Sequence, residues 1–164
     1  MTFLMMQPSR QVFIAPTGIQ VNSCISIAVD TAYVAAQQGR NINAGVYMMD
    51  NMINNGSSGE GQMELHTKVP VGFTIGFNSV PINPVSNDQV IITGFNVSQG
   101  SVFGSAGYPR QQPPLGPTQP PGSWWIGQAM NSGSQTYQIQ IAVTVGVIQP
   151  VTYYVNWDPF ITAQ

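Results

Sequence analysis

The residues that could do nucleophilic chemistry are few, because the chain has one histidine, His66, and one cysteine, Cys24. Nucleophilic catalysis needs a nucleophile beside a base, and a third group that orients the base. His66 falls on the polar face of an alternating segment, beside Glu64 and Lys68, whereas Cys24 lies in the apolar run 21–27. We therefore expect a surface histidine, a buried thiol, no catalytic residues and a protein that is not an enzyme.

Three carboxylates lie close together in the sequence around a glycine-rich turn: Asp50, Glu60 and Glu64. They could form an oxygen-rich calcium site or a carboxylate pair for glycosidic chemistry. The calcium loop of an EF-hand is absent, and no spacing forces these side chains together. Solvated charges that keep an edge strand from pairing are the favoured interpretation, and we expect neither a metal nor a cofactor.

Aromatic residues beside polar side chains are candidates for carbohydrate binding. Sugar faces stack on aromatic rings while Asn and Asp hold the hydroxyl groups. The candidate residues are Trp124, Trp125, Tyr154, Asp50 and Asn51. Because neighbouring residues of a strand face opposite ways, one of the two tryptophans should be partly exposed. Packing in the core or in a loop also explains such rings, so a lectin-like carbohydrate-binding module, as a single unit or a multimer, is the alternative hypothesis.

The elements that must position these residues are strands, because apolar and polar residues alternate along most of the chain. The clearest case is 137–145, whose apolar face alternates with a polar face of amides and hydroxyls. Similar patterns predict strands at 11–15, 21–30, 46–52, 62–69, 71–77, 89–97, 123–130 and 151–157. Within the strand predicted at 46–52, Met48 and Met49 should point to opposite faces, one of them into the core. A short helix fits only within 31–40.

About eight to ten short strands separated by turn residues favour an all-β fold. We expect a single-domain antiparallel β-sandwich, jelly-roll-like, that spans residues 1–164. The segment 109–122 contains six prolines and is too short to divide two domains. It is typical of a polyproline-like surface loop.

Charge is the other unusual feature, because charged residues make up 6% of the chain against roughly 25% in ordinary domains. Four scattered cations cannot form the basic surface that nucleic acid or an anionic membrane requires. No segment reaches the ~18 apolar residues of a membrane span, and no secretory signal is recognisable, so we expect a cytoplasmic protein. A formal charge of −2 gives little repulsion between copies.

Three segments together resemble a known family. These are Val46–Asn51, Gly59–Leu65 and the C-terminal Tyr153–Ile161, with its Trp-Asp-Pro-Phe-Ile ending. They are similar to the methionine-rich inclusion-body proteins of bacteria, the PixA-like and AidA-like proteins, over roughly residues 21–161. The resemblance implies a cytoplasmic protein that accumulates in dense or crystalline inclusions, often under population-density control. It brings no catalytic or ligand-binding residues.

The leading hypothesis is therefore a non-enzymatic, self-associating protein of the inclusion-body or storage type. Its expected partner is a second copy of itself, as a homo-oligomer or an inclusion lattice, with a glycan as the alternative partner. We expect the self-contact on the uncharged outer face of the strand 137–145. The residues of that face are Thr136, Gln138, Gln140 and Thr144.

Overall fold

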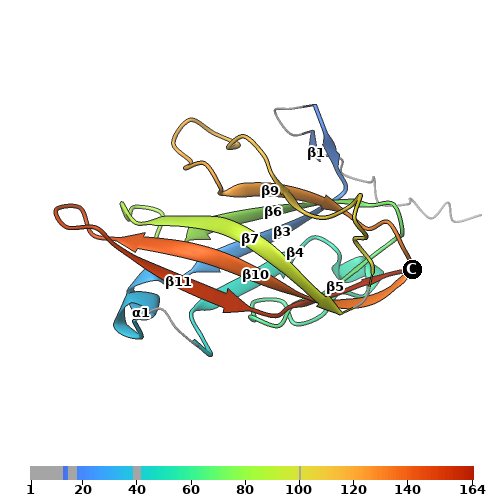
Figure 1. Ribbon diagram of the computed structural model, residues 1–164, viewed down its shortest axis with the longest axis horizontal. Coiled ribbons are helices and arrows are strands. Elements are labelled where there is room, and N and C mark those ends of the chain that lie inside the picture. Colours follow the sequence, from blue (N-terminus) through green and yellow to red (C-terminus); the bar gives the residue numbers. More distant parts are fainter. Residues whose placement is uncertain (1–12, 15–17, 39–41, 100) are drawn as a thin grey trace, which may run out of the picture.

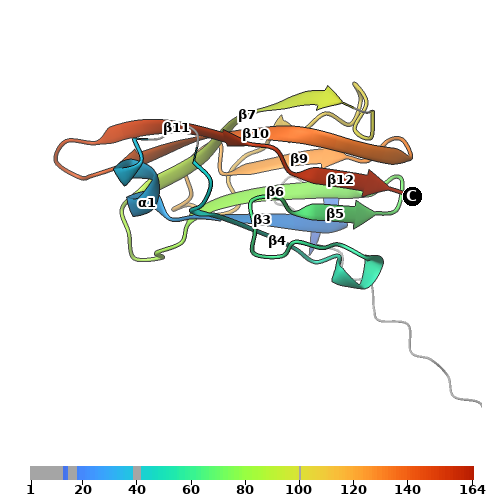
Figure 2. The ribbon, with the colours of Figure 1, turned by 90° about the horizontal axis from the view of Figure 1, so that it is seen from below.

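Two β-sheets packed face to face make up the described part of the computed structural model, which comprises residues 13–14, 18–38, 42–99 and 101–164. Figure 1 shows long strands along the molecule and the short helix α1 (Thr31–Ala36) at one end. The two layers are seen from another side in Figure 2. The all-β fold predicted from the alternating pattern is thereby confirmed.

The first layer, the β6 sheet, has the strand order β4-β3-β6-β9-β8. Its strands are β3 (Ser23–Val29), β4 (Val46–Asp50), β6 (Thr74–Pro81), β8 (Arg110–Gln111) and β9 (Trp124–Gln128). Strand β8 belongs to the Pro-rich segment and pairs with β9, so this segment lies at the edge of the sheet. Two further strands, β1 (Phe13–Ile14) and β2 (Gln20–Val21), pair only with each other.

The second layer, the β10 sheet, is built around β10 (Gly133–Val145). Strand β7 (Gln89–Gln99) pairs with one edge of β10. Strands β11 (Val151–Trp157) and β12 (Phe160–Ala163) pair with its other edge, one after the other in the same register. Strand β5 (His66–Val69) pairs with β12. The long uncharged strand is therefore an interior strand of its sheet. Its outer face is available for contact, but its backbone edges are not.

The core lies between the two sheets and is centred on Tyr137, which is fully buried. Its ring contacts Phe77 and Phe103 edge-on, at centroid distances of 6.1 and 5.6 Å, and stacks on Phe95 at 6.4 Å. These rings come from both sheets and join them. Apolar positions at every second residue thus become the interior of the sandwich.

Strand number and direction differ in detail from the expectation. The described residues contain twelve strands, three of which have only two residues. Two pairs, β3–β6 and β5–β12, are parallel, and the others are antiparallel. Alternation predicts which residues face the core but does not determine the direction of the neighbouring strand.

Several predicted strands are shorter in the structure. Strand β5 begins at His66 instead of residue 62, because Gly59 and Gly61 adopt φ values of 80° and 79° and turn the chain. Such positive φ values favour glycine. Of the strand predicted over 11–15, only β1 lies within the described residues. The predicted helix is α1, whose first turn is capped by the Asp30 carboxylate.

One prediction about side-chain direction is confirmed. Met48 is buried, whereas its neighbour Met49 is 45% exposed on the outer face of β4. On β6, Gly76 lies directly against the Trp124 indole, and a Cβ atom there would collide with that ring. No helix within the described ranges has the length and apolarity needed to cross a membrane.

Candidate functional site

The two candidate catalytic residues lie on opposite outer faces of the sandwich. Cys24 is half-buried on the outward side of β3, instead of in the core as expected, and burial raises the pKa of its thiol. His66 is on the outward side of β5, where its Nε2 lies 2.7 Å from the hydroxyl of Thr162. Burial and then the Lys68 charge lower the pKa of His66. Within the described residues no carboxylate bonds to this ring, so no acidic group orients it as a base.

The three candidate carboxylates separate into a pair and a single residue. Glu60 accepts a hydrogen bond from the Asp50 backbone N–H at 2.9 Å, and Asp50 accepts one from Met52 at 2.8 Å. The pKa of Glu60 is raised, chiefly by burial and further by the nearby Asp50 carboxylate. The hydrogen bond from the Asp50 backbone N–H acts in the opposite direction but does not cancel the rise. Glu64 lies apart, in the pocket described below. The described residues contain no group of three or more His, Cys, Asp or Glu suited to a metal ion.

The five candidate carbohydrate-binding residues are not gathered on one surface. Trp124 is buried on the outer side of β9 beneath Val21 and Leu115, and Trp125 faces the core next to Phe95. Asp50 and Asn51 lie at β4, where Asn51 accepts a hydrogen bond from the Cys24 N–H. Tyr154 lies on the other sheet and is 68% exposed. The carbohydrate hypothesis stays a prediction, without a shared platform for these residues.

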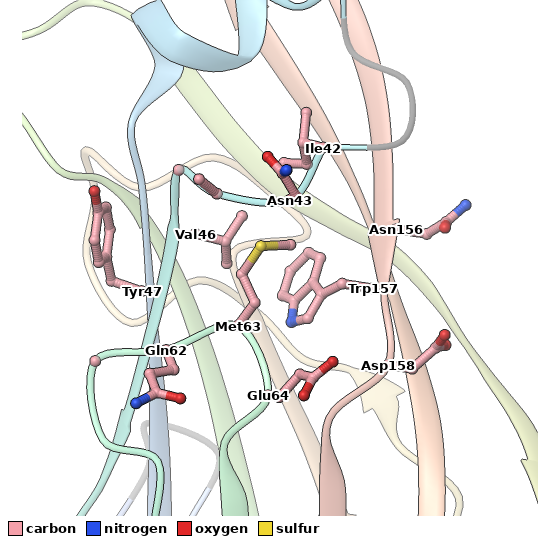
Figure 3. Close-up of a pocket in the computed structure, with 13 residues that line it drawn as sticks. Ile42, Asn43, Val46, Tyr47, Gln62, Met63, Glu64, Asn156, Trp157 and Asp158 are labelled. Atoms are coloured by element: carbon pink, nitrogen blue, oxygen red, sulfur yellow. The ribbon is translucent and has the colours of Figure 1, made fainter.

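A pocket opens between the two sheets where β4 approaches the end of β11 (Figure 3). Its volume is about 650 Å³. Trp157 and Met63 form its apolar interior; Trp157 is only 6% exposed, and its indole N–H donates to the Sδ atom of Met48 at 3.0 Å. The remaining lining residues come from three segments, 42–47, 61–64 and 156–158.

The rim of this pocket is acidic. Glu64 and Asp158 are both exposed, and Figure 3 shows their carboxylates on the same side of the Trp157 indole. No Lys or Arg is among the described residues that line the pocket. The site therefore offers an apolar interior with hydrogen-bond acceptors at its mouth and suits an apolar group that carries donors or positive charge.

A broad uncharged surface covers the outer side of β7, β10 and β11. These three strands contain no Asp, Glu, Lys or Arg. We call this surface the charge-free face; its side chains are Gln89, Ile91, Thr93, Asn96, Thr136, Gln138, Gln140, Ala142, Thr144, Thr152, Tyr154 and Asn156. All four residues predicted for the self-contact thus lie on one outward surface.

The charge-free face is organised in cross-strand rows. Ile91, Ala142 and Tyr154 face one another across the three strands and form an apolar row. In a neighbouring row, the hydroxyls of Thr144 and Thr152 are 2.9 Å apart. Hydroxyl and amide groups held in rows by a rigid sheet form a regular surface for contact with another molecule.

Exposed apolar side chains also gather at one end of the sandwich. The β10–β11 turn, residues 146–150, carries Val147 and Ile148, which are 74% and 95% exposed. A hydrogen bond from the Gly146 N–H to Asp88, at 3.4 Å, connects this turn to the residues just before β7. From the sequence we predicted the strands on either side of this turn, but neither its exposed apolar residues nor the pocket. Apolar residues between Gly146 and Pro150 were the available signal for the turn, since turns are normally polar.

Comparisons with known proteins identify a sequence family and a fold. A family model described as a domain of unknown function (DUF8788) matches residues 21–149. No curated protein matches the chain. Among solved structures, the inclusion body protein PixA from Burkholderia cenocepacia has a TM-score of 0.69 and 16% sequence identity, over 87% of this chain and 94% of that one. The resemblance predicted from the sequence is therefore confirmed in the fold.

Proposed function

We propose that this chain, which belongs to the family described as a domain of unknown function (DUF8788), is a non-enzymatic protein that self-associates into cytoplasmic inclusions. The observation that carries the proposal is the charge-free face of β7, β10 and β11. The fold shared with PixA, whose name describes it as an inclusion body protein, supports the proposal. So does the placement of Cys24 and His66 on opposite faces, which keeps the one thiol of the chain away from its one histidine.

The physical reason is the low cost of removing this surface from water. Pairing a charged surface requires the desolvation of ions, and each unpaired ion costs several kcal/mol. Amide and hydroxyl groups such as Gln138 and Thr144 can exchange water for matching groups of a second copy. The apolar row through Tyr154 adds a favourable hydrophobic contribution. Such a face binds a copy of itself with little repulsion.

The experiment is sedimentation velocity on the full chain over a range of concentrations, with a charge placed in the centre of the face. Gln140→Lys should weaken association at least tenfold, which corresponds to about 1.4 kcal/mol, because copies would bring like charges together. Gln111→Lys is the matched control, since Gln111 is exposed on β8 at the edge of the other sheet. It should associate as the wild type does.

Two results would contradict the proposal. One is a wild-type chain that stays monomeric at all concentrations. The other is a Gln140→Lys variant that assembles as well as Gln111→Lys, because the charge-free face would then be irrelevant to association.

A further inference from the structure

The β10–β11 turn exposes apolar side chains that no other segment within the described residues covers. Ile148 is 95% exposed, and Val147 beside it is 74% exposed. Sheet twist and hairpin geometry do not require apolar residues here, and Gly146 and Pro150 already make the turn. Exposed apolar residues gathered at one place indicate a contact site.

The pocket between β4 and β11 has the complementary properties. Its interior is the indole of Trp157 and the thioether of Met63, and its volume of about 650 Å³ is within the roughly 300–1,000 Å³ of ligand-binding cavities. Its rim carries the Glu64 and Asp158 carboxylates, which accept hydrogen bonds.

The turn offers the donors that this rim can use. No hydrogen bond from the backbone N–H of Val147, Ile148 or Gln149 is formed within the described residues. The turn also carries no acidic side chain that would repel the rim. An uncharged apolar turn with unpaired N–H groups therefore matches an apolar pocket with an acidic mouth.

We propose that the β10–β11 turn of one copy inserts into the pocket of a second copy, with Ile148 against the interior formed by Trp157 and Met63. This inference rests on the proposed self-association and adds a second contact to it. The occupant is a copy of this chain because the apolar turn and the pocket that fits it both belong to this molecule.

The chain cannot fill its own pocket. The turn precedes Val151 at one end of β11, and the pocket lies at Trp157 at the other end. The six residue steps from Val151 to Trp157, at about 3.3 Å each, separate the two sites by about 20 Å. The contact therefore joins different surfaces of two copies and leaves a free turn at one end and a free pocket at the other.

Such a head-to-tail contact generates rings or open chains instead of closed dimers. The charge-free face lies on the side of the same sheet and can pair a second row of copies. One contact that extends the assembly and one that joins its rows are together sufficient for a growing inclusion.

The test removes the turn and the pocket separately and then mixes the two variants. Ile148→Asp charges the turn, and Ala44→Arg fills the pocket from an exposed lining position. Both are made in the Gln140→Lys background, in which the charge-free face is weakened. Val85→Asp in the same background is the matched control, because Val85 is 85% exposed in the neighbouring β6–β7 turn. Urea unfolding midpoints establish that all variants fold.

We expect Ile148→Asp and Ala44→Arg each to weaken head-to-tail association at least tenfold, while Val85→Asp has no effect. An equimolar mixture of Ile148→Asp and Ala44→Arg should form a 1:1 complex that does not grow. The Ile148→Asp variant keeps its pocket, and the Ala44→Arg variant keeps the turn that fills it. A mixture that stays monomeric would overturn the inference, as would equal weakening by Val85→Asp. In both cases association of the wild-type chain would leave the proposed function standing, whereas a monomeric wild type would overturn both.

Discussion

Removing the Tyr137 hydroxyl should stabilise the protein. This side chain is fully buried among Phe77, Phe95 and Phe103, and its hydroxyl has no hydrogen-bond partner within the described residues. Burial, followed by the Asp50 charge, raises the pKa of Tyr137, so the hydroxyl stays protonated. An unpaired buried polar group costs about 1–3 kcal/mol. Tyr137→Phe removes that group and keeps the ring contacts.

The expected gain is about 1 kcal/mol in the free energy of unfolding, because the vacated hydroxyl volume offsets part of the benefit. This gain should raise the melting temperature by about 2–4 °C. The assay is urea unfolding of dilute protein, with an unchanged slope against urea. Tyr154→Phe, at a 68% exposed position, is the control and should stay within about 0.5 kcal/mol of the wild type. A Tyr137→Phe variant that is less stable by 1 kcal/mol or more would refute the reasoning.

Three further predictions concern packing, pH and salt. Gly76→Ala should lower the free energy of unfolding by about 1–3 kcal/mol, because the new Cβ atom would meet the Trp124 ring. Gly116→Ala is the control: a Cβ atom there has open space, so urea unfolding should show no change in stability. Burial raises the pKa of Asp88, but hydrogen bonds from Thr31 and other groups outweigh it and lower the pKa. Asp88 thus contributes stability that is present above its unfolded pKa of about 3.9 and is lost as the pH falls through the folded pKa. Asp88→Asn should be about 1–2 kcal/mol less stable than the wild type at pH 7, and urea unfolding curves should show this difference in stability disappearing below about pH 4. A difference that persists below pH 4 would contradict a stabilising role for the ionised Asp88 carboxylate. Association through the charge-free face should change less than about threefold between about 0.05 and 0.5 M salt, and sedimentation showing a stronger dependence would indicate charged contacts.

The features that the sequence predicted well are local. The polar and apolar faces of β10 follow from the alternation of residues 136–145, because a strand places every second side chain on one side. Met48 and Met49 separate for the same reason. The short helix began at Thr31 as expected and ended at Ala36.

The features that the sequence did not predict depend on distant segments. The pocket exists because β4 and the end of β11 meet at one side of the sandwich, and no local pattern places Trp157 beside Met63. The turn around Gly59 and Gly61 brings Glu60 to Asp50 while Glu64 joins the pocket. Trp124 was a candidate for stacking against a sugar, but Leu115 and Val21 pack over its ring.

The most direct test of the central claim is electron microscopy of cells that express the chain at its native level, with an antibody to locate the protein. The proposed function predicts dense or ordered cytoplasmic inclusions that carry the label and that become rarer in the Gln140→Lys variant. Label spread evenly through the cell, together with a monomer in the lysate at the same concentration, would contradict it.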